Sequence, residues 1–287
     1  MRPRPPVLLV VLVAAVATGG CGGSSSHASV STTTHRERST TTLAPTTVAA
    51  TTSTVTPTTV TPTTVAPTTE APTTAAPTTA PPPPAPSFVT RLVGVGNAGQ
   101  VIAVDAAGYG LTTATFTAYQ RTTSGWQQVF GPWTAHVGRN GFAPIGAKRE
   151  GDGRTPSGSY GFSFFFGVRA NPGVHFPYRS IGGPWIVWDD DPGSANYNEW
   201  IDNRTQAAGV APEPMDRSPV YDYGAVIDYN ASRTPALGSA IFFHVSSGGS
   251  TAGCVSLPMS ELVSVLRWLD PGRQPRIIMG TTATITG

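Results

Sequence analysis

The stretch Ile241-Phe-Phe-His244-Val-Ser-Ser-Gly-Gly-Ser-Thr251-Ala-Gly253-Cys254-Val-Ser-Leu-Pro-Met259 sets out the local architecture of this sequence. Its aromatic and branched residues up to Val245 predict a buried strand that carries His244, and the Gly- and Ser-rich run that follows predicts a loop. Farther on, four apolar residues recur at helical spacing: Leu262, Val265, Leu266 and Leu269. Prolines lie near both ends of this repeat, so we expect a helix here that follows shortly after Cys254.

The rest of the region 87–287 favours β structure. Short runs rich in branched and aromatic residues alternate with Gly-containing turns at 101–105, 113–119, 126–130, 158–166, 225–229, 239–245 and 276–279. Many short strands with few helices are typical of a sandwich or a barrel. We therefore expect residues 87–287 to form one mainly β domain with a single convincing helix, and about 200 residues suffice for one core.

The N-terminus has the pattern of an export signal. Two arginines precede an apolar run at 7–17, which is shorter than the roughly 20 residues that span a bilayer and fits a secretory h-region. The small residues before Cys21 resemble the lipobox of bacterial lipoproteins, although Thr18 stands where that motif usually has Leu. We expect a signal peptide at 1–20 and a lipid on Cys21, with plain secretion after ordinary cleavage as the alternative.

Residues 22–86 consist almost entirely of Thr, Pro, Ala, Val and Ser, with recurring Pro-Thr-Thr units. Such a composition cannot bury a core. We expect 21–86 to be a disordered linker, a stalk that reaches on the order of 200 Å when fully extended. Together with the lipid, this stalk predicts an extracytoplasmic protein anchored to the outer face of the cytoplasmic membrane and reaching into the cell wall.

Charge and residue spacing argue against several other functions. The net charge is +2, only 12% of residues are charged, and no cluster of Lys and Arg forms a stripe, so nucleic acid is not an expected partner. No metal-ligand spacing occurs, and we expect neither a metal nor a cofactor. The run 248–252 lacks the last Gly of the serine-hydrolase elbow G-x-S-x-G.

Cys254 is the candidate nucleophile. The chain has two cysteines, and if Cys21 carries lipid then Cys254 has no disulfide partner within the chain. An ordinary thiol, with a pKa near 8.5, is mostly protonated at neutral pH, and a helix N-terminus shifts it by less than one unit. His244 is therefore the expected base, with His136 and His175 as rivals, and Gly253 would let backbone amides approach an oxyanion. The alternative is that Cys254 is a buried, inert residue.

Two blocks resemble the L,D-transpeptidase family: the run from His244 to Thr251-Ala-Gly253-Cys254, and Asp152-Gly-Arg-Thr155-Pro156-Ser-Gly158. The resemblance covers about residues 90–280 and implies a mixed β-sandwich. It implies that Cys254 is the nucleophile, that His244 moves the proton and that the Val245 carbonyl orients the imidazole. It further implies that the amides of Gly253 and Cys254 form the oxyanion hole. The sequence departs from the family in its short loop, in Ala252 and in Ser256, which puts substrate positioning in question.

The same resemblance implies the substrate. Cys254 would form a thioester with a peptidoglycan stem peptide and pass it to an acceptor amine in a cross-linking reaction, and carbapenem-type β-lactams would acylate the thiol. We expect Ser250, Thr251, Tyr223 and Trp188 to contact substrate; for Trp188, a surface loop with aromatic anchors is the alternative. Two other functions stay open: a peptidoglycan hydrolase or carboxypeptidase that uses the same thiol, and a non-catalytic wall-binding module.

Overall fold

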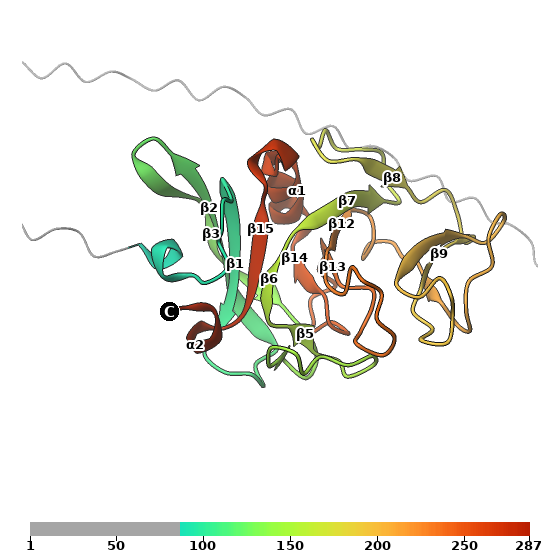
Figure 1. The fold of residues 1–287 in the computed structure, drawn as a ribbon. Helices are drawn as coiled ribbons and strands as arrows, with labels where there is room; N and C mark the ends of the chain where they lie inside the picture. The colour runs from blue at the N-terminus through green and yellow to red at the C-terminus, as the bar shows by residue number, and fades with distance from the viewer. Residues whose placement is uncertain (1–86) are drawn as a thin grey trace, which may run out of the picture. The chain divides into compact units, whose positions relative to one another are not determined.

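A ten-stranded mixed β-sheet organises residues 87–287, the part of the chain that the computed structural model describes (Figure 1). Its order is β6-β15-β1-β2-β3-β14-β13-β12-β7-β8. The strands span β1 (Gln100–Ala106), β2 (Thr113–Thr122), β3 (Gly125–His136), β6 (Gly158–Tyr160), β7 (Phe162–Gly167), β8 (Tyr178–Ser180), β12 (Gly224–Ile227), β13 (Phe242–Val245), β14 (Val255–Leu257) and β15 (Arg276–Thr281).

Smaller elements complete the domain. A three-stranded sheet has the order β10-β9-β11, and β4 pairs with β5. The bounds of these strands and of the helices are β4 (Phe142–Ala143), β5 (Thr155–Pro156), β9 (Ile186–Asp189), β10 (Glu199–Asp202), β11 (Glu213–Pro214), η1 (Phe88–Arg91), α1 (Met259–Trp268), η2 (Pro271–Arg273) and α2 (Thr282–Ile285). None of the helices within 87–287 has the length and apolar character needed to span a membrane. The expected signal peptide at 1–20, Cys21 and the linker 21–86 lie outside the described residues.

The large sheet curls so that its two halves share one core. β3 and β14 pair only through His136 and Ser256, which leaves the halves free to turn toward each other. Phe116 of β2 then stacks on Phe243 of β13, with ring centroids 5.6 Å apart. Figure 1 shows β1, β2, β3 and β15 on one side of this core and β7, β12, β13 and β14 on the other. The expected mainly β, sandwich-like fold is confirmed.

Helix α1 closes the same core. Leu262, Val265 and Leu266 are completely buried and pack with Val255 and Leu257 of β14. The predicted helix is confirmed in type and extent. The helix follows Cys254, as expected, after the short strand β14, whose parallel pairing with β13 keeps the chain extended from residue 255 to 257.

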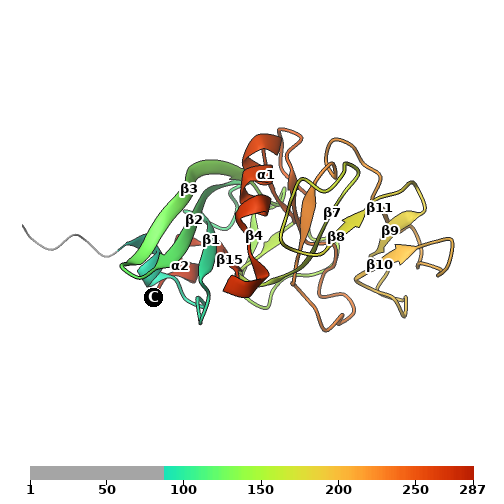
Figure 2. The same ribbon diagram turned by 90° about the horizontal axis from the view of Figure 1, so that it is seen from above.

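The opposite face of β13 and β14 carries a second apolar cluster. Phe242 and Cys254 pack there with Trp188, Met215 and Tyr221. Trp188 comes from β9, so the small sheet helps to cover this face, and Figure 2 shows β9, β10 and β11 beyond β7 and β8. Cys254 and the buried residues of α1 therefore belong to different clusters.

Candidate active site

Strand register places the thiol and the imidazole on one face of the sheet. Phe243 pairs with Val255 in the parallel ladder of β13 and β14, which sets Cys254 beside Phe242. Side chains alternate along a strand, so Phe242 and His244 point to one face and Phe243 to the other. Cys254 packs with Phe242, and it lines the same cleft as His244. His244 and Cys254, ten positions apart in the sequence, are thus brought together by adjacent strands.

The Cys254 thiol lies at the base of this cleft and is 6% exposed. Its S–H donates to the Ala240 carbonyl at 3.3 Å, and Sγ accepts the Phe242 amide at 3.4 Å. Burial raises the pKa of Cys254 to about 12, although the Phe242 N–H opposes that shift. The resting residue is therefore a neutral thiol that needs a base.

His244 lines the same cleft and presents a ring nitrogen that can accept a proton. Its Nδ1 lies 2.9 Å from the Val245 carbonyl oxygen, which only accepts, so Nδ1 carries the proton and Nε2 carries the lone pair. Burial lowers the pKa of His244 to about 4, with the Val245 bond opposing the shift. The imidazole is thus neutral at pH 7. The role implied for Val245 rests on this contact.

Tyr221 fixes the second side of the imidazole. Its ring meets that of His244 edge to face, with centroids 5.6 Å apart. The Tyr221 hydroxyl donates to Glu213 Oε1 at 3.1 Å, and Arg217 donates to the same oxygen at 2.6 Å. The exposed guanidinium of Arg217, the Glu213 carboxylate and the Tyr221 phenol are therefore linked by hydrogen bonds, and the Tyr221 ring packs against His244.

The loop before Cys254 is held by the block that contains Thr155. The Thr155 hydroxyl accepts the Gly138 amide at 2.9 Å and donates to the Cys254 carbonyl at 3.2 Å. Thr251 donates to the same carbonyl at 2.8 Å and accepts the Gly253 amide at 3.1 Å. The two sequence blocks that carry the family resemblance thus meet at the backbone of Cys254.

Gly253 occupies a position that disfavours any side chain. Its φ is +154°, and a Cβ atom would lie 3.0 Å from the Arg154 carbonyl oxygen and 3.2 Å from Ile241 Cδ1. The glycine lets the loop pack directly onto the block at 152–156. The Asp152 carboxylate holds that block from within, because it accepts bonds from Lys148 Nζ at 2.7 Å and the Arg154 amide at 2.8 Å.

The cleft has a volume of about 300 Å³. Among the residues expected to contact substrate, Ser250 and Thr251 line it together with His244 and Cys254. Both signs of charge line it as well, through Arg139, Lys148, Glu150, Asp190, Glu213 and Arg217. The cleft is therefore suited to a substrate that carries several polar or charged groups.

Trp188 and Tyr223 do not line this cleft. Trp188 is 5% exposed in the second cluster, where its indole N–H donates to Asn198 Oδ1 at 3.0 Å. Tyr223 packs against the core beside α1 and borders a shallow surface depression with Met259. The aromatic patterns that suggested substrate contact arise from packing, since both rings complete hydrophobic clusters.

Several residues of the site carry no sequence motif. Tyr221 lies in an aromatic run whose role the sequence leaves open, while Glu213, Arg217 and Asp190 come from loops and a two-residue strand. Only the folded chain brings them together. The rival histidines are elsewhere: His136 lies two strands away from His244, across Ser256, and His175 is exposed in the loop before β8. Within 87–287, no group of three or more His, Cys, Asp or Glu side chains is placed to hold a metal ion.

Comparison with known proteins identifies the family. One solved structure, the helical cell shape determining protein Pgp2 from Campylobacter jejuni, is similar with 12% identity and a TM-score of 0.35, covering 70% of this chain and 57% of its own. No curated protein matches the sequence. The family model YkuD, the L,D-transpeptidase catalytic domain, matches residues 99–279. Because this match spans more than half of the chain, the protein belongs to the YkuD family of L,D-transpeptidase catalytic domains.

Proposed function

We propose that this protein is a peptidoglycan L,D-transpeptidase that works through a thioester on Cys254. The family acts on peptidoglycan, and so in the cell wall. One observation supports the finer assignment above others: a buried thiol and an imidazole with a free Nε2 lie on one face of adjacent strands and line the same cleft. This is the pairing that nucleophilic catalysis by cysteine requires.

In the first step the thiol adds to the carbonyl carbon before the last residue of a stem peptide. The S–H proton passes to Nε2 of His244, the new C–S bond forms, and the carbonyl oxygen becomes an oxyanion. Collapse of this intermediate breaks the C–N bond, and the departing amine takes the proton from His244. Because the pKa of Cys254 lies far above that of His244 in the resting cleft, proton transfer accompanies attack rather than preceding it.

The oxyanion is expected to bind backbone amides at Gly253 and Cys254. The Gly253 amide donates to Thr251 Oγ1 in the resting chain, so the substrate oxygen must share or replace that acceptor. Thr251 and Thr155 both hold the Cys254 carbonyl, which keeps this part of the loop in place while the amide changes its partner.

In the second step an acceptor amine on a neighbouring stem attacks the thioester. The amine loses a proton to His244, the new C–N bond forms and the C–S bond breaks, and the thiolate regains the proton. One amide bond is broken and one is made, so the reaction needs no external energy source. Ser250 and Thr251, at the edge of the cleft, are proposed to contact the substrate.

We also propose that the domain acts outside the cytoplasm at the end of a lipid-anchored stalk. Replacement of Cys21 by Ser is then expected to release the protein from membranes into the soluble fraction. Fractionation followed by immunoblotting measures this. Equal membrane association of both forms would favour plain secretion or another anchor.

The catalytic proposal is tested by intact-mass spectrometry after incubation with a carbapenem. The wild-type chain is expected to gain the mass of one drug molecule on the peptide that contains Cys254, and the Cys254→Ser variant is expected to gain none. A matched Ser256→Ala variant controls for substitution two residues away. Absence of an adduct from the folded wild-type chain would favour a non-catalytic wall-binding module.

A further inference from the structure

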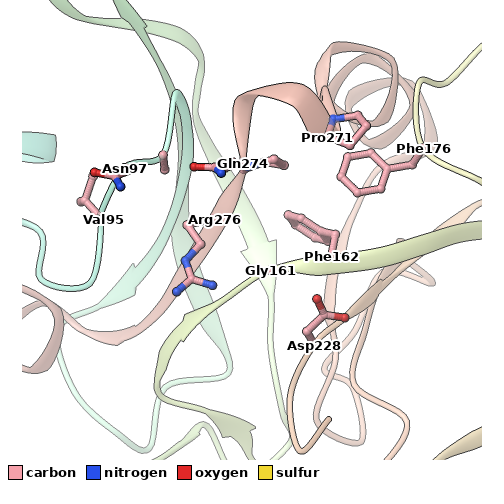
Figure 3. A pocket seen from close by; sticks show the side chains of 12 residues that line it. Val95, Asn97, Gly161, Phe162, Phe176, Asp228, Pro271, Gln274 and Arg276 are labelled. Atoms are coloured by element: carbon pink, nitrogen blue, oxygen red, sulfur yellow. The ribbon is translucent and has the colours of Figure 1, made fainter.

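A second cavity, of about 450 Å³, lies apart from the Cys254 cleft, and no residue lines both. We call it the Asp228–Arg276 pocket. The residues that matter here are Asn97, Phe162, Phe176, Asp228, Gln274 and Arg276 (Figure 3). Phe162 and Phe176 belong to the core beside α1, whereas Cys254 belongs to the cluster on the other face of the sheet.

The pocket holds two opposite charges that are not paired with each other. Within 87–287, neither Asp228 nor Arg276 takes part in any of the five ion pairs. They are nevertheless close, because Asp228 Oδ2 and a terminal guanidinium nitrogen of Arg276 both lie within 4 Å of the same point beside Gly161. Burial raises the pKa of Asp228, while a hydrogen bond from Ser163 and the charge of Arg276 lower it. Ser163 takes up part of the hydrogen-bonding capacity of the Asp228 carboxylate. The remaining lone pairs of Asp228 and the guanidinium of Arg276, which has no ion pair within 87–287, can still bind a ligand.

Gly161 keeps the space between these charges open. A Cβ atom at this position would lie 3.0 Å from Asp228 Oδ2 and 3.9 Å from a terminal guanidinium nitrogen of Arg276. The Asp228 amide donates to the Gly161 carbonyl at 3.1 Å, which fixes the carboxylate relative to the glycine. The gap between the strands β6 and β7 falls at Gly161, so the backbone itself borders the opening.

Two amides and two aromatic rings complete the lining. Figure 3 shows Asn97 and Gln274 reaching toward each other from two sides, and Asp228 below the Phe162 ring. The side-chain amides of Asn97 and Gln274 make no hydrogen bond with any of the residues 87–287. Phe162 and Phe176 meet edge to face with centroids 6.3 Å apart and supply an apolar wall. The pocket thus offers an anion, a cation, free hydrogen-bonding groups and an apolar surface.

We propose that this pocket binds a free amino acid as its zwitterion, with the ammonium group on Asp228 and the carboxylate on Arg276. The amides of Asn97 and Gln274 complete the carboxylate's hydrogen bonds, and the phenyl rings contact an apolar side chain. A neutral sugar could hydrogen-bond to both groups through its hydroxyls, but it carries no charge to oppose either of them, whereas a zwitterion opposes both. A simple cation or anion would satisfy one charge and be repelled by the other.

Calorimetric titration of the full chain tests this proposal, with leucine as the probe. Leucine is expected to bind at least about tenfold more tightly than N-acetylleucine, which lacks the ammonium, and leucinamide, which lacks the carboxylate. N-acetylglucosamine is expected not to bind. Equal binding of leucine and its blocked forms, preference for the sugar, or no binding of leucine would each overturn the proposal.

Variants locate the binding. Asp228→Asn and Arg276→Gln are each expected to weaken leucine binding at least about tenfold, and Gly161→Ala is expected to obstruct it. Asp216→Asn, on an exposed aspartate outside the pocket, and Gly108→Ala, where a Cβ meets nothing within 4 Å, are the matched controls. Carbapenem acylation of Cys254 reports that each variant is folded. Leucine binding that survives in folded Asp228→Asn, or falls equally in Asp216→Asn, would overturn the assignment.

Discussion

The Cys254 cleft and the Asp228–Arg276 pocket differ in the charge and bonding of their polar side chains. In the cleft the working groups are neutral and bonded: the thiol to Ala240, the imidazole to Val245. In the pocket the carboxylate and the guanidinium are charged and have no ion pair within 87–287. The difference separates two tasks. Moving a proton needs a donor and an acceptor whose protonation states are set by burial, whereas holding a zwitterion needs two permanent charges that do not already neutralise each other.

The largest expected effect is on the acylation rate, and it distinguishes loss of His244 in the cleft from loss of a charge in the pocket. Replacement of His244 by Ala removes the proton acceptor and is expected to slow carbapenem acylation at pH 7 by about 10²- to 10⁴-fold. Asp228→Asn is expected to leave that rate unchanged. Time-resolved intact-mass spectrometry gives both rates. His136→Ala and His175→Ala serve as controls, and an essential role for either histidine would contradict the assignment of the base.

Low pH is expected to destabilise the protein through His244. Its pKa of about 4 in the folded chain lies below its ordinary value of 6.5, so between these values the unfolded chain binds the proton and the folded chain does not. Stability from this residue is complete above pH 6.5 and is lost as the pH falls toward 4, by on the order of 3 kcal/mol.

Urea unfolding of wild type and His244→Gln at pH 7 and pH 4.5 measures this loss, which should be smaller in the variant. Acylation should stay constant from pH 7 down to pH 5 and decline near pH 4. An apparent pKa near 6.5 in that profile would show that the imidazole is solvated rather than buried.

Gly253→Ala should disturb the cleft without changing a functional group. The substitution forces a Cβ into a backbone with φ of +154° and against the Arg154 carbonyl, and we expect a loss of about 2 to 3 kcal/mol in unfolding free energy. Acylation should slow as well, because the loop that carries Cys254 must shift. Gly249→Ala, where a Cβ meets nothing within 4 Å, is the control, and thermal unfolding that ranks the two equally would argue against the contact.

The smallest expected effect comes from Thr155→Val, which removes the hydroxyl that bonds to the Cys254 carbonyl. Loss of the hydroxyl leaves the Gly138 amide without its acceptor and removes one of two donors from the Cys254 carbonyl. We expect a loss of about 1 to 2 kcal/mol in urea unfolding. Thr134→Val, on the exposed side of β3, should be close to neutral, and a similar loss there would point to a general effect of valine.

The sequence predicts the parts of the site that depend on local pattern. The strand that carries His244, the helix at 259–268 and the turn glycine at 253 all leave periodic or compositional signals, and these were enough to predict a mainly β fold. The run 158–166 was expected to be one strand, but the chain breaks at Gly161, where the glycine faces Asp228. Local pattern does not reveal that contact, because its partner lies far along the chain.

The rest of the site depends on long-range packing. Tyr221 contacts His244, and Glu213 of β11 accepts the hydrogen bond from Tyr221, because the small sheet folds over the face that carries Cys254. Trp188 and Tyr223 show the converse: aromatic residues in suggestive runs were expected at the substrate, yet both complete hydrophobic clusters. An aromatic residue that packs and one that lines the cleft give the same sequence signal, and only the folded chain shows that Tyr221 lines the cleft whereas Trp188 and Tyr223 do not.

Acyl transfer from a stem peptide to a tagged amine is the most direct test of the central claim. A synthetic tetrapeptide stem is incubated with the full chain and a mass-labelled acceptor amine, and both protein and products are measured by mass spectrometry over time. The account predicts a transient adduct on the peptide containing Cys254 and a cross-linked product that carries the label. A labelled product formed without any adduct on Cys254, or an adduct that resolves only to the hydrolysed stem whatever the amine concentration, would contradict it.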